Sequence, residues 1–179
     1  MLPITTARLV LRDFVEADWA DVQEYASDPE VCRHMVWGPN TPEQTKAFIA
    51  STLPGQVERP RRKHELAIVM NGKVIGGARL DIHNVERGEA DLGYTVARPL
   101  WSRGIATEAA RALLKAGFGE LKLHRIFATC SPENAASSRV LEKIGMQREG
   151  LMREHILIKG RWRDSLLYAV LDRDWNAIA

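Results

Sequence analysis

The sequence lacks the features that define several large classes of protein. It has no apolar run near the roughly 18 residues of a membrane span. Its beginning, MLPITTARLVLRDF, does not combine a basic leader with an apolar stretch, so no secretory signal is predicted. The two cysteines, Cys32 and Cys130, lie too far apart in the sequence to indicate a disulfide framework or a metal cluster. We therefore expect a cytoplasmic protein that does not contact membranes.

The low net charge of the chain argues against a nucleic-acid-binding protein. The 25 basic and 23 acidic residues leave a formal charge of +2, which is too small to indicate nucleic-acid binding. The densest basic run, RPRRK at 59–63, has no aromatic stacking residues beside it and is interpreted as a solvated loop, with a nucleic-acid patch as the alternative. The histidines at 34, 64, 83 and 124 show no ligand spacing, so we predict no metal ion.

The composition that is present is typical of a globular domain, with 45% apolar and 27% charged residues over 179 positions. There are no internal repeats, low-complexity tracts or linker-like segments, so residues 1–179 are expected to form one domain with a sizeable core. Strand-like patterns occur at 8–14, 65–70, 73–80, 89–97, 124–130, 146–158 and 162–171. Helices are expected from 18 to about 26, from 41 onward, from 104 to about 117 and over 134–145.

Residues that favour caps mark two of the helix starts. Asp18 can cap the first helix. Thr41 and Gln44 form the pattern of a capping box before the second helix.

Glycines and element order predict how the strands connect. Asn71-Gly72 is a strong signal for a tight hairpin turn, and Gly93 inside a strand is interpreted as a bulge. The strand–helix–strand order over 89–130 favours a parallel pair within an otherwise antiparallel sheet. We therefore expect a mixed α/β fold in which helices cover a sheet.

The segment LWSRGIATEA, residues 101–110, has the features of an anion-binding helix start. Gly104 stands where the helix begins, and the small residues Ser102 and Ala106 leave successive backbone N–H groups open. Those groups and the helix dipole suit a pyrophosphate. The segment matches neither the P-loop pattern nor the GxGxxG of dinucleotide folds. Taken alone, it is equally compatible with a plain strand-to-helix connection.

Two longer stretches carry a family resemblance. GYTVARPLWSRGIATEA and PENAASSRVLEKIGM resemble the acetyl-CoA-binding core of the GNAT N-acetyltransferase superfamily, in the RimJ/RimL-like branch of ribosomal-protein N-terminal acetyltransferases. TARLVLRDFVEADW, SDPEVCRHMVW and REHILIKGRWRDSLLYAVL resemble other parts of that branch, so the similarity covers nearly the whole chain. The family loop reads Gln/Arg-x-x-Gly-x-Gly/Ala, and Trp101 departs from its polar first position.

The resemblance implies both a fold and a cofactor. The expected fold is a twisted, mostly antiparallel mixed sheet of about seven strands with about four helices, in which a splayed parallel strand pair binds CoA. The expected co-substrate is acetyl-CoA, with no metal, and its acetyl group passes directly to a primary amine. The residues expected to hold it are Ser102, Arg103, Gly104, Ile105, Ala106 and Thr107 at the pyrophosphate, and Thr95 and Val96 along the pantetheine arm.

The acceptor implied by this branch is a protein or peptide N-terminal α-amine. A small amine, such as a polyamine, an amino acid or an antibiotic, is the alternative that keeps the same chemistry. A non-catalytic CoA-binding sensor is an alternative of another class, and a nucleotide-phosphate binder is a weaker one. The branch also makes a homodimer plausible.

Acetyl transfer to an amine needs a deprotonated amine, a donor to the thioester oxygen and an acid for the departing thiolate. Asn134 and Ser137 form the Asn-x-x-Ser of the family motif. By resemblance, Asn134 positions substrate or cofactor, and Ser137 lies near the CoA sulfur as a candidate general acid. Both are also good capping residues, so a helix cap is the alternative for each.

Four acidic or basic residues on expected strands are candidates for the catalytic base: Glu89, Asp91, Glu154 and His155. Asp91 is preferred because the branch often has an acidic residue before Gly93-Tyr94, with an arginine ion pair as the alternative. Glu154 and His155 lie on the closing hairpin, which borders the acceptor cleft in this branch, or else are exposed strand residues.

Three further residues invite a functional interpretation. Trp37 resembles a position near the acceptor site, although a core tryptophan is the alternative. Tyr94 is interpreted as a core residue. Cys130 has no His and Asn/Asp partners placed to activate it, so we predict no acyl-enzyme.

Overall fold

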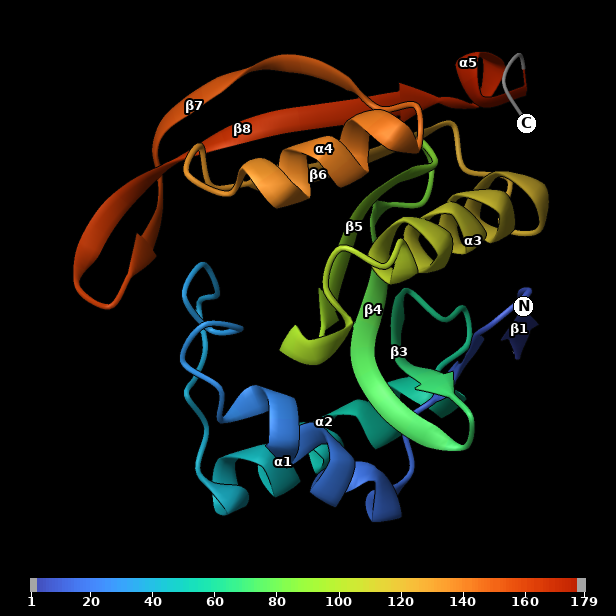
Figure 1. Cartoon of the computed structure of the whole chain (residues 1–179). Helices are drawn as coiled ribbons and strands as arrows, with labels where there is room; N and C mark the ends of the chain where they lie inside the picture. The colour runs from blue at the N-terminus through green and yellow to red at the C-terminus, as the bar shows by residue number, and fades with distance from the viewer. Residues whose placement is uncertain (1–2, 177–179) are drawn as a thin grey trace.

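Eight strands form one sheet in the computed structural model, which describes residues 3–176 (Figure 1). Their order across the sheet is β1-β2-β3-β4-β5-β6-β8-β7, and β5–β6 is the parallel pair among otherwise antiparallel neighbours. The strands are β1 (Ile4–Thr5), β2 (Val10–Asp13), β3 (Lys63–Met70), β4 (Lys73–Asn84), β5 (Glu89–Val96), β6 (Arg125–Cys130), β7 (Gln147–Ile158) and β8 (Arg161–Leu171). The mixed sheet with one parallel pair is confirmed.

Helices lie on both faces of this sheet (Figure 1). They are α1 (Trp19–Ala26), α2 (Pro42–Val57), α3 (Ile105–Gly119), α4 (Ala135–Lys143) and α5 (Asp172–Asn176), with short 3-10 turns at Glu16–Asp18 and Arg98–Leu100. The elements beyond the expected seven strands and four helices are the two-residue strand β1 and the five-residue helix α5.

Alternation along the strands separates two cores. Leu80 of β4 and Leu92 of β5 pack with Leu113 of α3 and Leu141 of α4 in one cluster. On the opposite face, a second cluster joins the strands to α1 and α2; its members are Phe14, Val22, Tyr25, Ala26, Val31, Ile49, Ala67 and Val74. The sheet therefore has an α3/α4 face and an α1/α2 face, each closed by burial of apolar surface.

Several local predictions are confirmed by the backbone. Thr41 caps α2 and Gln44 completes the capping box, with the Gln44 side-chain oxygen 2.8 Å from the Thr41 nitrogen. Asn71 and Gly72 form the hairpin turn with φ of 52° and 79°, the left-handed values that such a turn needs. Gly104 is the N-cap of α3 with φ 76°.

Two local predictions are wrong. Asp18 makes no side-chain cap at the start of α1; its carboxylate accepts from the Val15 amide at 2.9 Å and forms an ion pair with Arg12. Gly93 is in regular register with Arg79, so it is not a bulge. A Cβ at Gly93 would lie 3.3 Å from the Arg79 Nε atom, so the glycine instead leaves room for that side chain.

The basic run at 59–63 leads from the end of α2 into β3. Arg59, Arg62 and Lys63 are exposed, while Arg61 forms a bidentate pair with Asp13 at 2.6 and 3.0 Å. Among residues 3–176, no helix has the length and apolar character needed to cross a membrane.

His64 of β3 is 4% exposed and faces the α3/α4 side, and neither ring nitrogen has a hydrogen-bond partner among the described residues. Burial, with a smaller effect from Arg61, lowers its pKa from 6.5 to about 4. Between pH 6.5 and pH 4 the unfolded chain therefore binds a proton that the folded chain does not. Stability contributed by neutral His64 is complete above pH 6.5 and is lost as the pH falls through this window.

We predict that the wild-type free energy of unfolding falls by about 2 kcal/mol from pH 7.5 to pH 5 because of this residue. In His64→Leu that part of the decrease should disappear, as measured by urea denaturation at the two pH values. The exposed His155→Leu variant is the matched control and should keep the wild-type difference. An unchanged pH dependence in His64→Leu would contradict the assignment.

Candidate active site

The main cavity opens where β5 and β6 separate. The two strands pair only over Glu89–Asp91 and Arg125–Phe127 and then diverge (Figure 1). A cavity of about 850 Å³ occupies this region, a size that suits a small ligand. Because its lining comes from both sides of the sheet, the cavity passes through the gap between the strands.

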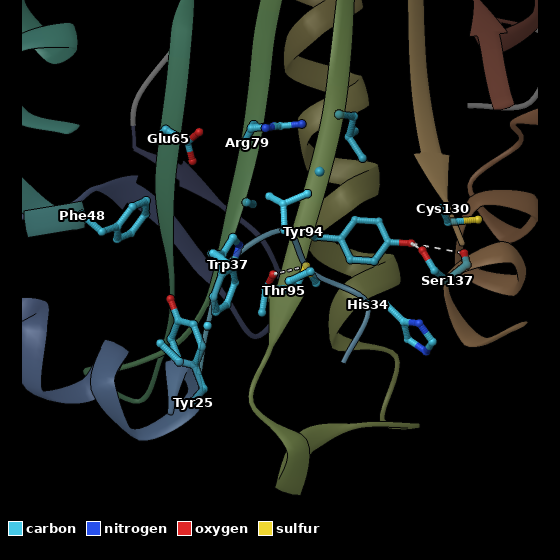
Figure 2. A pocket seen from close by; sticks show the side chains of 18 of the residues that line it. Tyr25, His34, Trp37, Phe48, Glu65, Arg79, Tyr94, Thr95, Cys130 and Ser137 are labelled. Carbon is cyan, nitrogen blue, oxygen red and sulfur yellow. Dashed lines mark hydrogen bonds between the residues drawn. The ribbon is translucent and has the colours of Figure 1, made fainter. Parts of the chain in front are cut away.

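Strand alternation divides the cavity lining into two parts (Figure 2). Lining residues on the α3/α4 side are Tyr94, Cys130, Asn134, Ser137 and Leu141. Lining residues on the α1/α2 side include Phe14, Tyr25, Trp37, Phe48, Glu65, Arg79, Asp91 and Thr95. The structure thus brings together five of the residues expected at the site: Trp37, Asp91, Thr95, Asn134 and Ser137.

Ser137 is held in the first turn of α4. Asn134 is the N-cap of this helix, and its side-chain oxygen accepts from the Ser137 amide at 3.1 Å. The Ser137 hydroxyl lies 3.0 Å from the Tyr94 hydroxyl, which points across the gap from β5 (Figure 2). Burial raises the pKa of Tyr94, so its phenol stays protonated. Asn134 is therefore a helix cap, and Ser137 lines the cavity with a fixed hydroxyl beside the positive end of a helix dipole.

The loop before α3 presents unused backbone donors. Ser102 and Gly104 both have positive φ, 60° and 76°. The amides of residues 102–107 donate to no acceptor within residues 3–176, whereas the Glu108 amide already donates to the Gly104 carbonyl. These amides therefore form a concentration of free donors at a helix N-terminus, as an anion site requires.

The free edge of β5 leads from this loop into the gap. The Ala97 amide donates to the Ile75 carbonyl at 2.8 Å, so alternation turns the backbone groups of Val96 away from β4. The indole N–H of Trp101 donates to the Val96 carbonyl at 2.7 Å. Trp101, the position that departs from the family loop pattern, thus fastens the loop to the strand end.

An ion pair from the start of the chain braces the same loop. Glu108 in the first turn of α3 forms bonds with Arg8 at 2.6–2.7 Å and with the Thr6 hydroxyl at 2.6 Å. Arg8 also donates to the Arg103 carbonyl at 3.0 Å. Although burial acts to raise it, the bonds from Thr6 and Arg8 hold the pKa of Glu108 below its usual value. Glu108, which the sequence did not mark as functional, therefore positions the loop.

Asp91 is already occupied by two partners. Its carboxylate pairs with Arg79 and with the His83 Nε2 atom, the latter at 2.8 Å. The ion pair with an arginine, which was the alternative to a catalytic role for Asp91, is therefore present. Glu89 likewise lies 3.7 Å from Arg125. Both carboxylates are therefore already engaged in ion pairs, and a role for Asp91 as the base stays a prediction.

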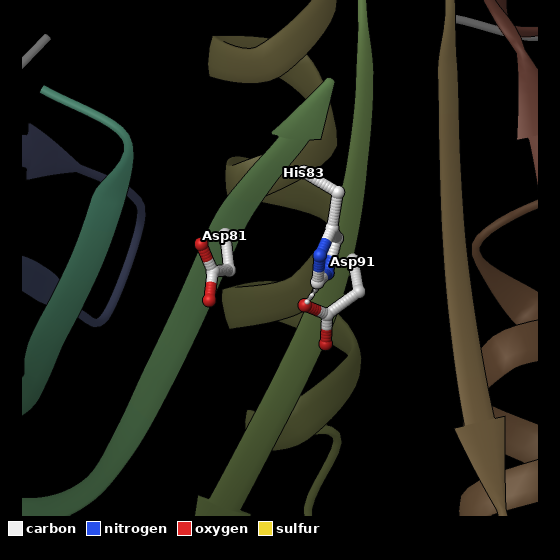
Figure 3. A group of neighbouring side chains, drawn as sticks. All are labelled: Asp81, His83 and Asp91. Carbon is white, nitrogen blue, oxygen red and sulfur yellow. Dashed lines mark hydrogen bonds and ion pairs between the residues drawn. The ribbon is translucent and has the colours of Figure 1, made fainter. Parts of the chain in front are cut away.

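Asp81, His83 and Asp91 form a group whose potential ligand atoms lie within 4.8 Å of one another (Figure 3). The positive Arg79 side chain shares Asp91, and the His83 ring stacks on Phe127 with centroids 5.7 Å apart. The contacts within the group are those of a hydrogen-bonded ion-pair cluster. The absence of a metal stays a prediction.

Glu154 and His155 do not meet the other candidates. Both are exposed on β7, where the register with β8 shifts between Met152 and Ile156, and neither lines the cavity. Glu154 has φ 47°, and its amide donates to Asp164. Both are exposed strand residues, which was the alternative for them, and their contact with an acceptor stays a prediction. Arg163 of β8 lines the cavity instead and donates to the His34 carbonyl at 2.8 Å.

Cys130 has the surroundings of an unreactive thiol. It is buried at the end of β6, and its sulfur lies 3.4 Å from the Ser138 hydroxyl. Burial raises the pKa of the Cys130 thiol, so the protonated form is favoured.

Sequence reasoning missed cavity residues from distant elements. Tyr94, interpreted as core, packs against the core but also reaches Ser137. Glu65, Tyr25 and Phe48 approach from β3, α1 and α2, and no local motif marks them. The signal that was available for Glu65 is its ionisable side chain inside the apolar strand 65–70.

Comparisons with known proteins agree with this geometry. The family profile described as "Acetyltransferase (GNAT) domain" matches residues 8–147. The chain is 38% identical over 176 residues to the uncharacterized N-acetyltransferase YnaD of Bacillus subtilis (strain 168), covering 97% of this chain and 99% of that one. It is 33% identical over 107 residues to the ribosomal protein uS5-alanine N-acetyltransferase of Escherichia coli (strain K12), covering 58% and 54% of the two chains.

Among solved structures, the fold is similar to that of a GNAT-family acetyltransferase from Bacillus anthracis. The TM-score is 0.84 at 35% sequence identity, and the match covers 96% of this chain and 99% of the other.

The Arg8–Glu108 brace yields a prediction about stability. The double-mutant cycle of Arg8→Ala and Glu108→Ala should give a coupling energy of about 1 kcal/mol, because a charged pair with several hydrogen bonds links the chain start to α3. Urea denaturation of the four proteins measures it. Additive effects of the two substitutions would show that the brace contributes no pairwise energy.

Proposed function

The chain belongs to the acetyltransferase (GNAT) family and is an N-acetyltransferase, and from this we propose that it moves acetyl from acetyl-CoA directly to a protein or peptide N-terminal α-amine. The observation that carries the proposal is the cavity that crosses the sheet between β5 and β6. A cavity open to both faces lets two substrates approach one point from opposite sides. The N-terminus of α4 on one side of the cavity and aromatic rings on the other suit a thioester donor and a peptide acceptor.

The donor is expected at the free amides of residues 102–107 and the N-terminus of α3. A pyrophosphate there gains hydrogen bonds and a favourable dipole interaction. The free edge of β5 offers backbone groups to the extended pantetheine arm, as a partner strand would use them. Gly104 supports this proposal because its positive φ starts the helix without a side chain over the amides.

The chemistry needs one bond made and one broken. The acceptor nitrogen attacks the thioester carbon, the carbon–sulfur bond breaks, and the sulfur leaves with the electron pair. We assign Ser137 the role of hydrogen-bond donor to the departing thiolate, aided by the N-terminus of α4. Tyr94 holds the Ser137 hydroxyl in place.

The acceptor amine needs only a modest base. An α-amine has a pKa near 8, so a substantial fraction is already neutral at cellular pH. His34 lines the cavity, and burial together with Arg33 and Arg163 lowers its pKa, which favours the neutral, proton-accepting form. Neutral His34 or bulk water can therefore take the proton that the attacking amine releases.

A protein acceptor is favoured over a small amine by the relative that acts on ribosomal protein uS5. The experiment that tests the acceptor is acetyl-CoA-dependent release of free thiol across short peptides with different N-terminal residues and a set of small amines. Peptide-selective turnover supports the proposal. Turnover with small amines alone would replace the acceptor, and acetyl-CoA binding without any turnover would favour a sensor module.

Ser137→Ala should lower kcat about 10- to 100-fold because one hydrogen bond to a developing anion is lost. The KM for acetyl-CoA should change little, because the α3 loop is intact. Ser138→Ala is the matched control, since this neighbour contacts Cys130 and not the cavity. Equal kcat in the two variants would remove Ser137 from the mechanism.

Cys130→Ala should keep substantial turnover, because the amine attacks acetyl-CoA directly and the buried thiol forms no acyl-enzyme. Steady-state rates and the intact mass of the protein mixed with acetyl-CoA measure this. An acetylated protein, together with loss of turnover in a folded Cys130→Ala variant, would establish a covalent intermediate instead.

A further inference from the structure

The α1/α2 side of the cavity contains a carboxylate without a bonded partner. Glu65 lines the cavity from β3, and among residues 3–176 it makes no hydrogen bond or ion pair (Figure 2). Burial raises its pKa. A half-buried carboxylate in this position is costly unless a cation or donor reaches it.

The charges around Glu65 do not supply that partner within the protein. Arg79, the nearest cation in the same strand row, is bonded to Asp91. Burial, Asp81 and Asp91 act to raise the pKa of Glu65, whereas Arg79 and Lys63 act to lower it. The net shift of this pKa is upward, so the two cations do not offset the burial of the carboxylate.

Aromatic rings form the walls next to Glu65. Phe48 and Phe14 meet edge to face with centroids 5.6 Å apart, and Tyr25 and Trp37 complete the wall (Figure 2). Burial, together with the nearby charges of Asp18 and Glu65, raises the pKa of Tyr25, so its hydroxyl lies in the field of Glu65. A carboxylate beside aromatic faces is the chemistry that recognises an ammonium or guanidinium group.

Glu65 and Ser137 line the cavity from opposite faces of the sheet, and the proposed function places the reaction at Ser137. Glu65, Arg79 and Gly93 lie in one row across β3, β4 and β5. Two strand spacings place the Glu65 backbone about 10 Å from β5. Ser137 is reached on the opposite face through Tyr94. With the attacking amine at Ser137, a cation bound at Glu65 is a second group of the acceptor.

We propose that the acceptor carries a second cationic group, and that Glu65 and the rings of Tyr25, Phe48 and Trp37 bind it. This inference rests on the proposed function, because it concerns the acceptor of the same cavity. In a peptide, the group is a lysine or arginine side chain close to the N-terminus. In a small molecule, the same chemistry is the second ammonium of a diamine.

The test compares acceptors that differ in one charge. The peptide pair is Ser-Lys-Ala-Phe and Ser-norleucine-Ala-Phe, and the small-molecule pair is 1,5-diaminopentane and n-pentylamine. Each is assayed with wild type, Glu65→Gln and the control Glu86→Gln, which alters an exposed loop carboxylate. We expect wild type to favour the lysine peptide in kcat/KM by about tenfold or more, which corresponds to about 1.4 kcal/mol.

Glu65→Gln should reduce this preference to within about twofold, by lowering kcat/KM for the lysine peptide and not for the norleucine peptide. Glu86→Gln should keep it. Equal kcat/KM within both pairs in wild type, or an undiminished preference in Glu65→Gln, would overturn the inference. If wild type prefers the diamine over n-pentylamine but does not prefer the lysine peptide, the cation site at Glu65 is supported and its ligand is a small polyamine.

Calorimetric titration of the CoA-loaded protein with the two peptides distinguishes a failure of this inference from a failure of the proposed function. If wild type acetylates none of these acceptors, the proposed function fails. Tighter binding of the lysine peptide than of the norleucine peptide, lost in Glu65→Gln, would still support the cation site. Equal binding of the two peptides would overturn it.

Discussion

The early separation of β5 from β6 creates both the cavity and the unpaired strand edge beside it. After three residue pairs the strands diverge, and the sheet gives up backbone hydrogen bonds that it would otherwise make. Neighbouring groups compensate in part: the Trp101 indole bonds the Val96 carbonyl, and the Tyr94 hydroxyl spans the gap to Ser137. The remaining free edge and the free amides before α3 are the features that an extended, phosphorylated ligand would satisfy.

Alternation along β5 then distributes the chemistry. Tyr94 faces α4 and its fixed hydroxyl, whereas Asp91 and Thr95 face the aromatic walls supplied by α1 and α2. The two faces of β5 can therefore present different environments to two substrates without a conformational change. The Arg8–Glu108 ion pair ties the loop before α3 to the start of the chain, and the bond from Trp101 to Val96 ties the loop to β5.

Much of the fold could be predicted because its signals are local. The Thr41 capping box, the Asn71-Gly72 turn and the Gly104 helix start each depend on a few adjacent residues, and the family resemblance supplied the splayed pair. The wrong predictions and the missed residues depend instead on contacts between distant parts of the chain. The role of Asp18 is decided by Arg12 across a turn, that of Gly93 by a side chain on the next strand, and Glu65 joins the cavity only when helices from elsewhere enclose it. Glu154 and His155 lie outside the cavity, and the irregular register of the hairpin around them has no simple sequence signature.

The central claim is that the donor binds in the gap between β5 and β6, with its pyrophosphate on the loop before α3. Hydrogen–deuterium exchange with and without CoA tests it most directly. The account predicts slower exchange for the amides of residues 102–107 and for Val96 at the free strand edge, with little change in α1 and α2. Binding of CoA that leaves those amides unprotected, and protects another part of the chain, would contradict it.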